Sequence, residues 1–230
     1  MKKFTKMWAI AACALFAGTA AVNAEDYTWK FVTAGDATTY AIRSDGSLWS
    51  WGWNEKGQGG NGVSERTATP TLADGNRVWK KAVGGKAYGF FLAEDGSLWA
   101  AGTHEGGVQG TNDGIDHKVL TRIGTDNDWA DMACSRFWGY SGFAIKTNGT
   151  LWAWGKNSAG QLGIGNTQTQ TAPVQVGADM DWKQVAAGCS SVLALKTDGS
   201  LWGWGFNMYS ELFGHEGKQL SPVRLGSETD

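Results

Sequence analysis

Histidine is the side chain most often used for metal binding and proton transfer, and this sequence of 230 residues contains three, His104, His117 and His215. All three fall in segments rich in Gly, Asn and Asp, and their spacing to one another and to the cysteines matches no zinc site. Asn and Asp side chains within residues 112–116 offer oxygens to calcium, but their spacing fits no calcium loop and tight turns need the same residue types. The sequence therefore predicts neither a metal site nor a cofactor.

Nucleophilic and phosphate-binding chemistry have equally little support. Cys189, Ser190 and Ser191 have no candidate base beside them in the sequence. The glycine-rich stretches 57–62 and 160–165 are not followed by the Gly-Lys-Ser/Thr that a phosphate loop requires. We therefore expect a protein that binds a partner, not an enzyme.

The first 24 residues have the pattern of a secretory signal peptide. Three lysines precede an apolar stretch at 7–17 that is too short to span a bilayer, and Val22-Asn23-Ala24 forms a small-residue cleavage site. Cleavage after Ala24 predicts a secreted or periplasmic protein that begins at Glu25. The alternative takes Cys13 as a lipidation site, although only a few apolar residues would then precede it.

Charge limits the class of partner. Subtracting the three leader lysines from the 20 basic residues leaves 17, against 22 acidic residues, so the composition does not attract nucleic acid or an anionic membrane. No later segment is apolar for long enough to cross a bilayer. Residues 25–230 are sufficient for a single domain with a sizeable core.

One pentapeptide recurs four times and defines the organisation of the chain. Asp45-Gly46-Ser47-Leu48-Trp49 is followed by related sequences that begin at residues 95, 148 and 198. A second anchor, a tryptophan at residues 29, 79, 129 and 182, opens each unit. These anchors divide the chain into four repeats, at about 27–76, 77–126, 127–179 and 180–230, with a three-residue insertion in the third.

The repeats have the signals of short strands joined by tight turns. Asp-Gly or Asn-Gly between apolar runs is typical of a two-residue hairpin, because both turn residues need a positive φ. The runs on either side of this turn, a strand upstream and a strand at Pro173 or Pro222 give four strands per repeat, and no window has a helical period. Large apolar residues on both faces predict an all-β, β-propeller-like array of four blades, each packed on the next.

Residues 152–165, Trp-Ala-Trp-Gly-Lys-Asn-Ser-Ala-Gly-Gln-Leu-Gly-Ile-Gly, resemble the signature of the regulator of chromosome condensation repeat. The first repeat keeps Asn54, Gly57 and Gln58 of this pattern, whereas the second has Ala101 in place of its second tryptophan. The fourth repeat reads Ser-Glu-Leu-Phe at 210–213, where Gly-Gln-Leu-Gly is expected. The resemblance covers nearly all of residues 25–230 and implies a β-propeller, and the leader is consistent with an exported bacterial member of the family.

The resemblance raises the question of ring closure, because the family's usual ring has seven blades. At about 51° per blade, four repeats cover only about 206°. Unaltered blade geometry would then leave an open arc with two bare sheet faces. The alternatives are a distorted, closed ring of four blades, an open arc capped by irregular ends, and half of a dimeric ring of eight blades. A homodimer is therefore one of the expected assemblies.

Two tryptophans after the leader are not explained by the repeat, Trp53 and Trp138. Trp53 aligns with Thr103, Lys156 and Phe206, and a position that varies this freely usually lies near solvent. Aromatic residues on exposed loops commonly anchor partners. We therefore take Trp53 and Phe206 as candidate binding residues.

Trp138 lies in the insertion of the third repeat. The stretch Arg136-Phe137-Trp138-Gly139-Tyr140 places three aromatic rings and an arginine in a connection that does not need them for closure. Such residues are enriched at interaction hot spots, so Arg136, Phe137, Trp138 and Tyr140 are candidate binding residues as well. In the alternative interpretation, Phe137 or Trp138 fills the space left by Ala101.

Cys134 and Cys189 occupy nearly matching points of neighbouring repeats. A disulfide between them and a pair of small reduced thiols both remain open.

The function that best fits these features is that of a secreted or periplasmic, non-catalytic propeller. We expect it to bind a protein or glycan partner through loop aromatics. The alternatives are an extracellular carbohydrate-active enzyme, which would need two convergent acidic groups, and a purely structural repeat protein of a surface assembly.

Overall fold

The computed structural model describes residues 28–207, 212 and 217–226 of the chain. These residues form four antiparallel sheets of four strands each, and the strands follow chain order within every sheet. The predicted signal peptide, residues 1–24, lies outside the described residues, as does His215.

Each sheet corresponds to one repeat of the sequence. The first sheet contains β1 (Trp29–Ala34), β2 (Thr38–Arg43), β3 (Leu48–Gly52) and β4 (Thr67–Asp74). The second contains β5 (Trp79–Gly84), β6 (Tyr88–Ala93), β7 (Leu98–Gly102) and β8 (His117–Arg122). The third contains β9 (Trp129–Cys134), β10 (Ser141–Lys146), β11 (Leu151–Gly155) and β12 (Gln170–Gln175). The fourth contains β13 (Trp182–Ala187), β14 (Ser191–Lys196), β15 (Leu201–Asn207) and β16 (Gly217–Leu225).

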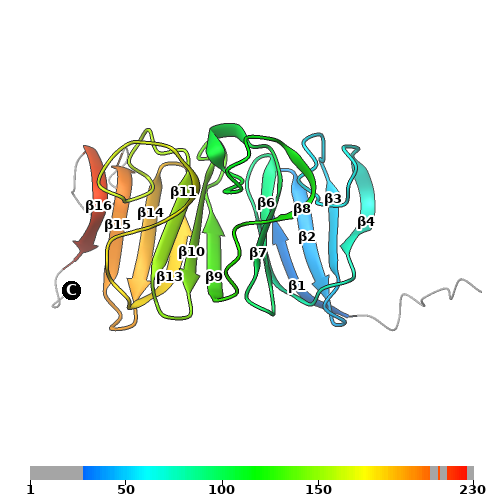
Figure 1. Cartoon of the computed structure of the whole chain (residues 1–230), viewed down its shortest axis with the longest axis horizontal. Helices are drawn as coiled ribbons and strands as arrows, with labels where there is room; N and C mark the ends of the chain where they lie inside the picture. Colours follow the sequence, from blue (N-terminus) through cyan, green and yellow to red (C-terminus); the bar gives the residue numbers. More distant parts are fainter. Residues whose placement is uncertain (1–27, 208–211, 213–216, 227–230) are drawn as a thin grey trace, which may run out of the picture.

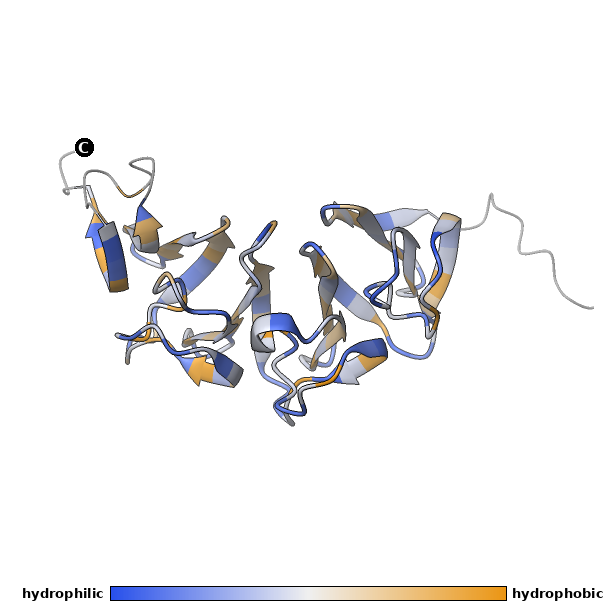
Figure 2. Cartoon of the chain, turned by 90° about the horizontal axis from the view of Figure 1, so that it is seen from above, coloured by the Kyte–Doolittle hydropathy of each residue, from blue (hydrophilic) through white to orange (hydrophobic). Residues whose placement is uncertain are grey.

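The sheets stand in a row, with the first and the fourth at opposite ends (Figure 1). Seen from above, the row bends into an open arc (Figure 2). Residues of β1, β5, β9 and β13 line one cavity of about 210 Å³, so the first strand of every sheet lies on the inner side of the arc. The expectation of an all-β array of four sheets is confirmed, and the sheets of the described residues form an open arc.

The recurring pentapeptide makes the same set of hydrogen bonds in each sheet. The Asp45 carboxylate accepts from the Ser47 backbone N–H at 2.9 Å and from the Ser47 hydroxyl at 2.6 Å. The Ser47 hydroxyl oxygen in turn accepts from Trp49 Nε1 at 2.8 Å. Asn148, Thr150 and Trp152 reproduce this arrangement in the third sheet. The pentapeptide therefore fixes both the hairpin turn and the orientation of the tryptophan that follows it.

That tryptophan packs edge to face on the tryptophan that opens its own repeat. Ring centroids lie 5.9–6.3 Å apart in the four pairs, Trp29–Trp49, Trp79–Trp99, Trp129–Trp152 and Trp182–Trp202. Aromatic pairs prefer this arrangement, because the positive ring edge meets the negative ring face. The pairs link the first and third strands of each sheet across the second.

Consecutive sheets pack through a second tryptophan of the third strand. Trp154 and Trp204 are fully buried. Their indole N–H groups donate to carbonyls of the preceding sheet's loop, Trp154 to Val108 and Trp204 to Gln161, each at 2.8 Å. Each of the three hydrophobic clusters joins residues of two neighbouring sheets, so a sheet of this chain obtains its core from its neighbours.

The second repeat has Ala101 where the third and fourth have Trp154 and Trp204, and another residue of the interface between the first and second sheets fills this space. Ala101 is fully buried, and Leu120 of β8 packs into the cluster beside it. Leu120 occupies the position that is Pro70, Pro173 and Pro222 in the other repeats. The alternative interpretation, in which Phe137 or Trp138 fills this space, is wrong, because both side chains are 60% exposed.

One short 3-10 turn, η1 (Glu105–Gly107), is the single helical element in the described part of the chain. None of the described residues forms a helix of the length and apolar character needed to span a membrane.

Candidate functional site

The candidate binding residues lie in or next to the connections at one edge of the arc, which we call the loop edge. Within each antiparallel sheet the connection from first to second strand and the connection from third to fourth strand lie at the same end. The loop edge therefore comprises residues 35–37, 53–66, 85–87, 103–116, 135–140, 156–169, 188–190 and 212 among those described. The short Asp-Gly and Asn-Gly turns lie at the opposite edge.

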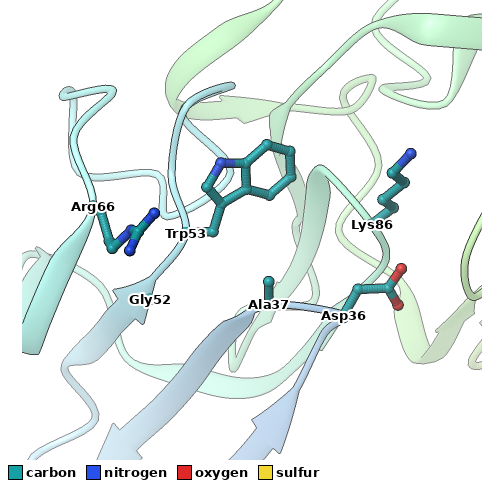
Figure 3. A pocket seen from close by; sticks show the side chains of 6 residues that line it. All are labelled: Asp36, Ala37, Gly52, Trp53, Arg66 and Lys86. Carbon is teal, nitrogen blue, oxygen red and sulfur yellow. The ribbon is translucent and has the colours of Figure 1, made fainter.

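Trp53 begins the long loop of the first sheet and lines a cavity of about 590 Å³. Its backbone is held on both sides, since Trp53 N–H donates to the Ala37 carbonyl at 2.8 Å and Thr38 Oγ1 donates to the Trp53 carbonyl at 2.6 Å. The half-buried ring stands between Arg66 on one side and Lys86 with Asp36 on the other (Figure 3). A fixed backbone with a freely variable side chain explains why the repeat tolerates Trp, Thr, Lys and Phe here.

Lys86 connects this cavity to the insertion of the third repeat. Its side chain comes from the loop between β5 and β6, and its ammonium lies 2.8 Å from the centroid of the Trp138 ring. A cation over a tryptophan face is attracted by the ring quadrupole. Lys86 and Asp36 were not among the candidates predicted from the sequence, although both occupy a repeat position that varies, as Asp36, Lys86, Arg136 and Cys189. The variation that identified Trp53 could have identified them too.

The insertion loop holds its two exposed rings on a well-fixed backbone. Ser135 N–H donates to the Ser141 carbonyl, and Arg136 N–H donates to the Gly188 carbonyl of the fourth sheet. Phe137 has φ +52°, a left-handed conformation that is uncommon for a side chain of this size. Phe137 and Trp138 are 60% exposed, and Arg136 is exposed beside them. Strained backbone of this kind is concentrated at binding and active sites.

Tyr140 does not belong to the exposed set. Its side chain is only 3% exposed, and its ring lies 6.0 Å from the Tyr88 ring and 6.4 Å from the Trp138 ring, measured between centroids. Burial, together with Glu105 at its hydroxyl, raises the pKa of Tyr140 to about 12. Tyr140 therefore packs against Trp138 on the buried side of the loop, which corrects the expectation that it contacts a partner directly.

Phe206 stands apart from the other candidates. It lies half-buried in β15 of the fourth sheet, whereas Trp53 takes the equivalent position in the first sheet, at the other end of the row (Figure 1). Phe206 N–H donates to the Ser190 carbonyl, as Trp53 N–H does to Ala37. The structure thus brings Trp53, Lys86, Phe137 and Trp138 into one region and leaves Phe206 outside it.

The remaining chemically active side chains are two cysteines, Cys134 and Cys189, and two histidines, His104 and His117. Cys134 is buried and Cys189 exposed, and both are free thiols, so the candidate disulfide is not formed. Burial raises the pKa of Cys134 to about 12. His104 Nδ1 lies 2.6 Å from an Asp116 oxygen, and His117 Nε2 lies 2.8 Å from an Asp113 oxygen, so each carboxylate has its own histidine partner. No group of three or more metal-ligating side chains occurs among the described residues.

This arrangement is suited to recognition. The Trp53 cavity combines an aromatic ring with two cations and one carboxylate, Arg66, Lys86 and Asp36. A single carboxylate does not supply the pair of acidic groups on which most glycoside hydrolases depend. Exposed aromatic rings flanked by arginine and lysine can instead bury an apolar side chain of a partner and pair with its acidic groups.

Comparisons with known proteins identify the repeat. The model of the regulator of chromosome condensation (RCC1) repeat matches residues 45–92 and 148–195, and a second model of the same repeat matches residues 29–58. The ultraviolet-B receptor UVR8 of Arabidopsis thaliana is 30% identical over 163 residues, which are 70% of this chain and 37% of the receptor.

Solved structures show the same fold at low sequence identity. Yeast RCC1 (Prp20) superposes with a TM-score of 0.76 at 22% identity, over 89% of this chain and 50% of that protein. Human WBSCR16 superposes with a TM-score of 0.75 at 21% identity, over 88% of this chain and 54% of that protein. This chain thus spans about half the length of these two solved structures. The resemblance in residues 152–165 is confirmed, and the chain belongs to the RCC1 repeat family.

Proposed function

We propose that this protein is an exported, non-catalytic propeller that binds a partner protein through its loop edge. The observation that carries the proposal is the exposure of Phe137 and Trp138 on a loop whose backbone is left-handed at Phe137. Large apolar rings in water favour association, and a fixed loop loses little conformational entropy when it binds. The family supports a protein partner, since yeast Prp20 has been solved bound to Kap60 and is described as binding Gsp1p and histones.

The partner surface should combine apolar and acidic groups. Phe137 and Trp138 offer the apolar contact, while Arg136, Lys86 and Arg66 supply positive charge around it. The formal charge of the whole chain is −2, so this positive region is local and favours a defined acidic patch over general attraction to anions.

The pattern of residues 1–24 supports the export part of the proposal. The expected result is that the protein accumulates outside the cytoplasm with Glu25 as its first residue, measured by fractionation and N-terminal sequencing. Retention in the cytoplasm with an uncleaved leader would contradict this part of the proposal.

A capture experiment tests the binding function. The immobilised processed protein is exposed to an extracellular or periplasmic fraction, and the Phe137→Ala/Trp138→Ala double variant is compared with Met180→Ala. Met180 is a matched control because it is 61% exposed but lies at the opposite edge. We expect the wild type and Met180→Ala to retain the same protein, and the double variant to lose it at least about tenfold.

Two results would overturn the proposal. Equal capture by the double variant would show that the loop edge is not the binding surface. Retention on immobilised glycans, lost in the same double variant and without capture of any protein, would assign the loop edge to carbohydrate.

A further inference from the structure

The outer face of the first sheet exposes residues that are buried at the same positions of the other three sheets. We call the face that each sheet turns to the sheet before it the leading face. Trp29 is 46% exposed, against 0–4% for Trp79, Trp129 and Trp182. Val32 is 66% exposed, against at most 5% for Ala82, Met132 and Val185. Trp51 is partly exposed, whereas its counterparts Trp154 and Trp204 are fully buried.

We call the opposite face of each sheet, which it turns to the sheet after it, the trailing face. The trailing face of the fourth sheet also exposes apolar residues. Strands β6 and β14 are the second strands of their sheets. Every residue of β6 is buried, whereas half-exposed and buried residues alternate along β14, so only one face of β14 is covered. The half-exposed set includes Leu193 and Leu195, which together with Leu201 line a shallow groove of about 160 Å³. The counterparts of Leu201 in the other sheets, Leu48, Leu98 and Leu151, are fully buried.

A repeated backbone hydrogen bond identifies what each bare face would contact. The glycine of each hairpin turn accepts, through its carbonyl, from the N–H of the tryptophan that opens the next sheet. The pairs are Gly46 with Trp79 at 2.9 Å, Gly96 with Trp129 at 3.2 Å and Gly149 with Trp182 at 3.1 Å. Gly199 occupies the fourth position of this series, and no atom lies within 4 Å of the point where its Cβ would stand. Among the described residues, no tryptophan pairs with Gly199 in this way, and no turn glycine pairs with Trp29.

We propose that a second copy of this chain covers both faces. The trailing face of one copy packs on the leading face of the other. Two-fold symmetry generates a second, identical contact with the roles of the two copies exchanged, and the two contacts together close a ring of eight blades. A second copy is the favoured occupant because the same two faces already pair three times within the chain, through equivalent residues. Each copy is an open arc (Figure 2), and eight blades need about 45° each, close to the roughly 51° of a seven-bladed ring.

The mass of the processed protein in solution tests this assembly. Light scattering coupled to size exclusion is expected to give two chains, with no growth beyond two chains as the concentration rises. Val32→Asp on the leading face and Leu195→Asp on the trailing face should each weaken the dimer by at least about tenfold in dissociation constant. Met180→Asp is the matched control, since it changes an equally exposed apolar residue away from both faces and should leave the dimer intact. Circular dichroism of each variant verifies that the sheets remain folded.

Mixing the two face variants identifies which faces meet. Each variant keeps one intact face, so a mixture of Val32→Asp and Leu195→Asp can form one wild-type contact and should associate more tightly than either variant alone. A wild-type protein that remains monomeric at every concentration would overturn the proposal. So would masses that grow into longer chains, or a dimer that only one of the two variants disrupts, since the latter would mean that a face packs on its own copy.

Discussion

Trp53 and Trp154 stand at the ends of third strands or just beyond them, but their surroundings give them different roles. The Trp154 ring is enclosed between two sheets, lies 5.1 Å from the Phe90 ring centroid and donates its N–H to Val108. Trp53 is fixed only through its backbone, and its half-buried ring faces an open cavity. Burial and a specific hydrogen bond mark the structural tryptophan, while variation among the repeats marks Trp53 as the candidate binding residue.

Alanine substitution should separate these two roles in stability. Trp154→Ala empties a packed interface and leaves the Val108 carbonyl without its donor, so it should lower the free energy of unfolding by about 3–5 kcal/mol. Trp53→Ala removes a ring that other repeats replace freely and should cost less than about 1 kcal/mol. Chemical denaturation monitored by circular dichroism measures both values. Equal losses would show that Trp53 belongs to the core.

The sequence predicts the repeat tryptophans better than it predicts the site. Eleven of them follow the repeat, and the hydrogen bonds of Asp45, Ser47 and Trp49 show why these residue types recur together. Tyr140 was misassigned, because a residue next to an exposed insertion can still turn inward onto Tyr88. The variable repeat position of Lys86 could have marked it as a candidate, but its contact with Trp138 joins two different repeats and cannot be read from periodicity.

At the scale of elements, the second repeat shows how two departures from the pattern compensate each other. Ala101 replaces a tryptophan and Leu120 replaces a proline, and both changes occur at the same interface. Tyr40 also replaces the hydrogen bond of the missing tryptophan. Its hydroxyl donates to the Gln58 carbonyl at 3.0 Å, and in the interface of the third and fourth sheets the Trp204 indole N–H donates to the equivalent carbonyl, that of Gln161. From the sequence, filling of this vacancy by Phe137 or Trp138 was one of two open interpretations. Leu120 was not considered, because it lies 19 positions further along the chain and in a different strand.

A double-mutant cycle tests this compensation. Ala101→Trp alone should clash with Leu120 and cost about 1–3 kcal/mol, since overpacking of a filled core is destabilising. Leu120→Pro alone should leave a void beside Ala101. The combined variant restores the pair found in other repeats, and proline is tolerated in the outermost strand of a sheet, so it should be more stable than the sum of the single changes predicts. Strict additivity of the free energies of unfolding would contradict direct packing of the two residues.

At the scale of the whole molecule, stability should be distributed unevenly along the row. A sheet in the middle is covered by neighbours on both faces, whereas each end sheet has one face that no other sheet of the described residues covers. In arrays where every unit contacts only its neighbours, stability is the sum of each unit's own contribution and its interfaces. The end sheets of a single arc are therefore the first to open, and contact with a second copy would remove this difference.

Hydrogen exchange measured by mass spectrometry tests both parts of this argument. In the Val32→Asp chain, which we expect to be monomeric, the amides of β14 should exchange faster than those of β6, because opening of an end sheet breaks only one interface. In the wild-type protein, above the concentration at which it dimerises, exchange in β14 should slow while exchange in β6 remains nearly unchanged. Equal exchange of the two strands in the Val32→Asp chain would contradict the uneven distribution of stability. Fast exchange of β14 in a confirmed wild-type dimer would contradict the assignment of this face to the contact, because a strand buried by a second copy can exchange only when the copies separate or the sheet opens.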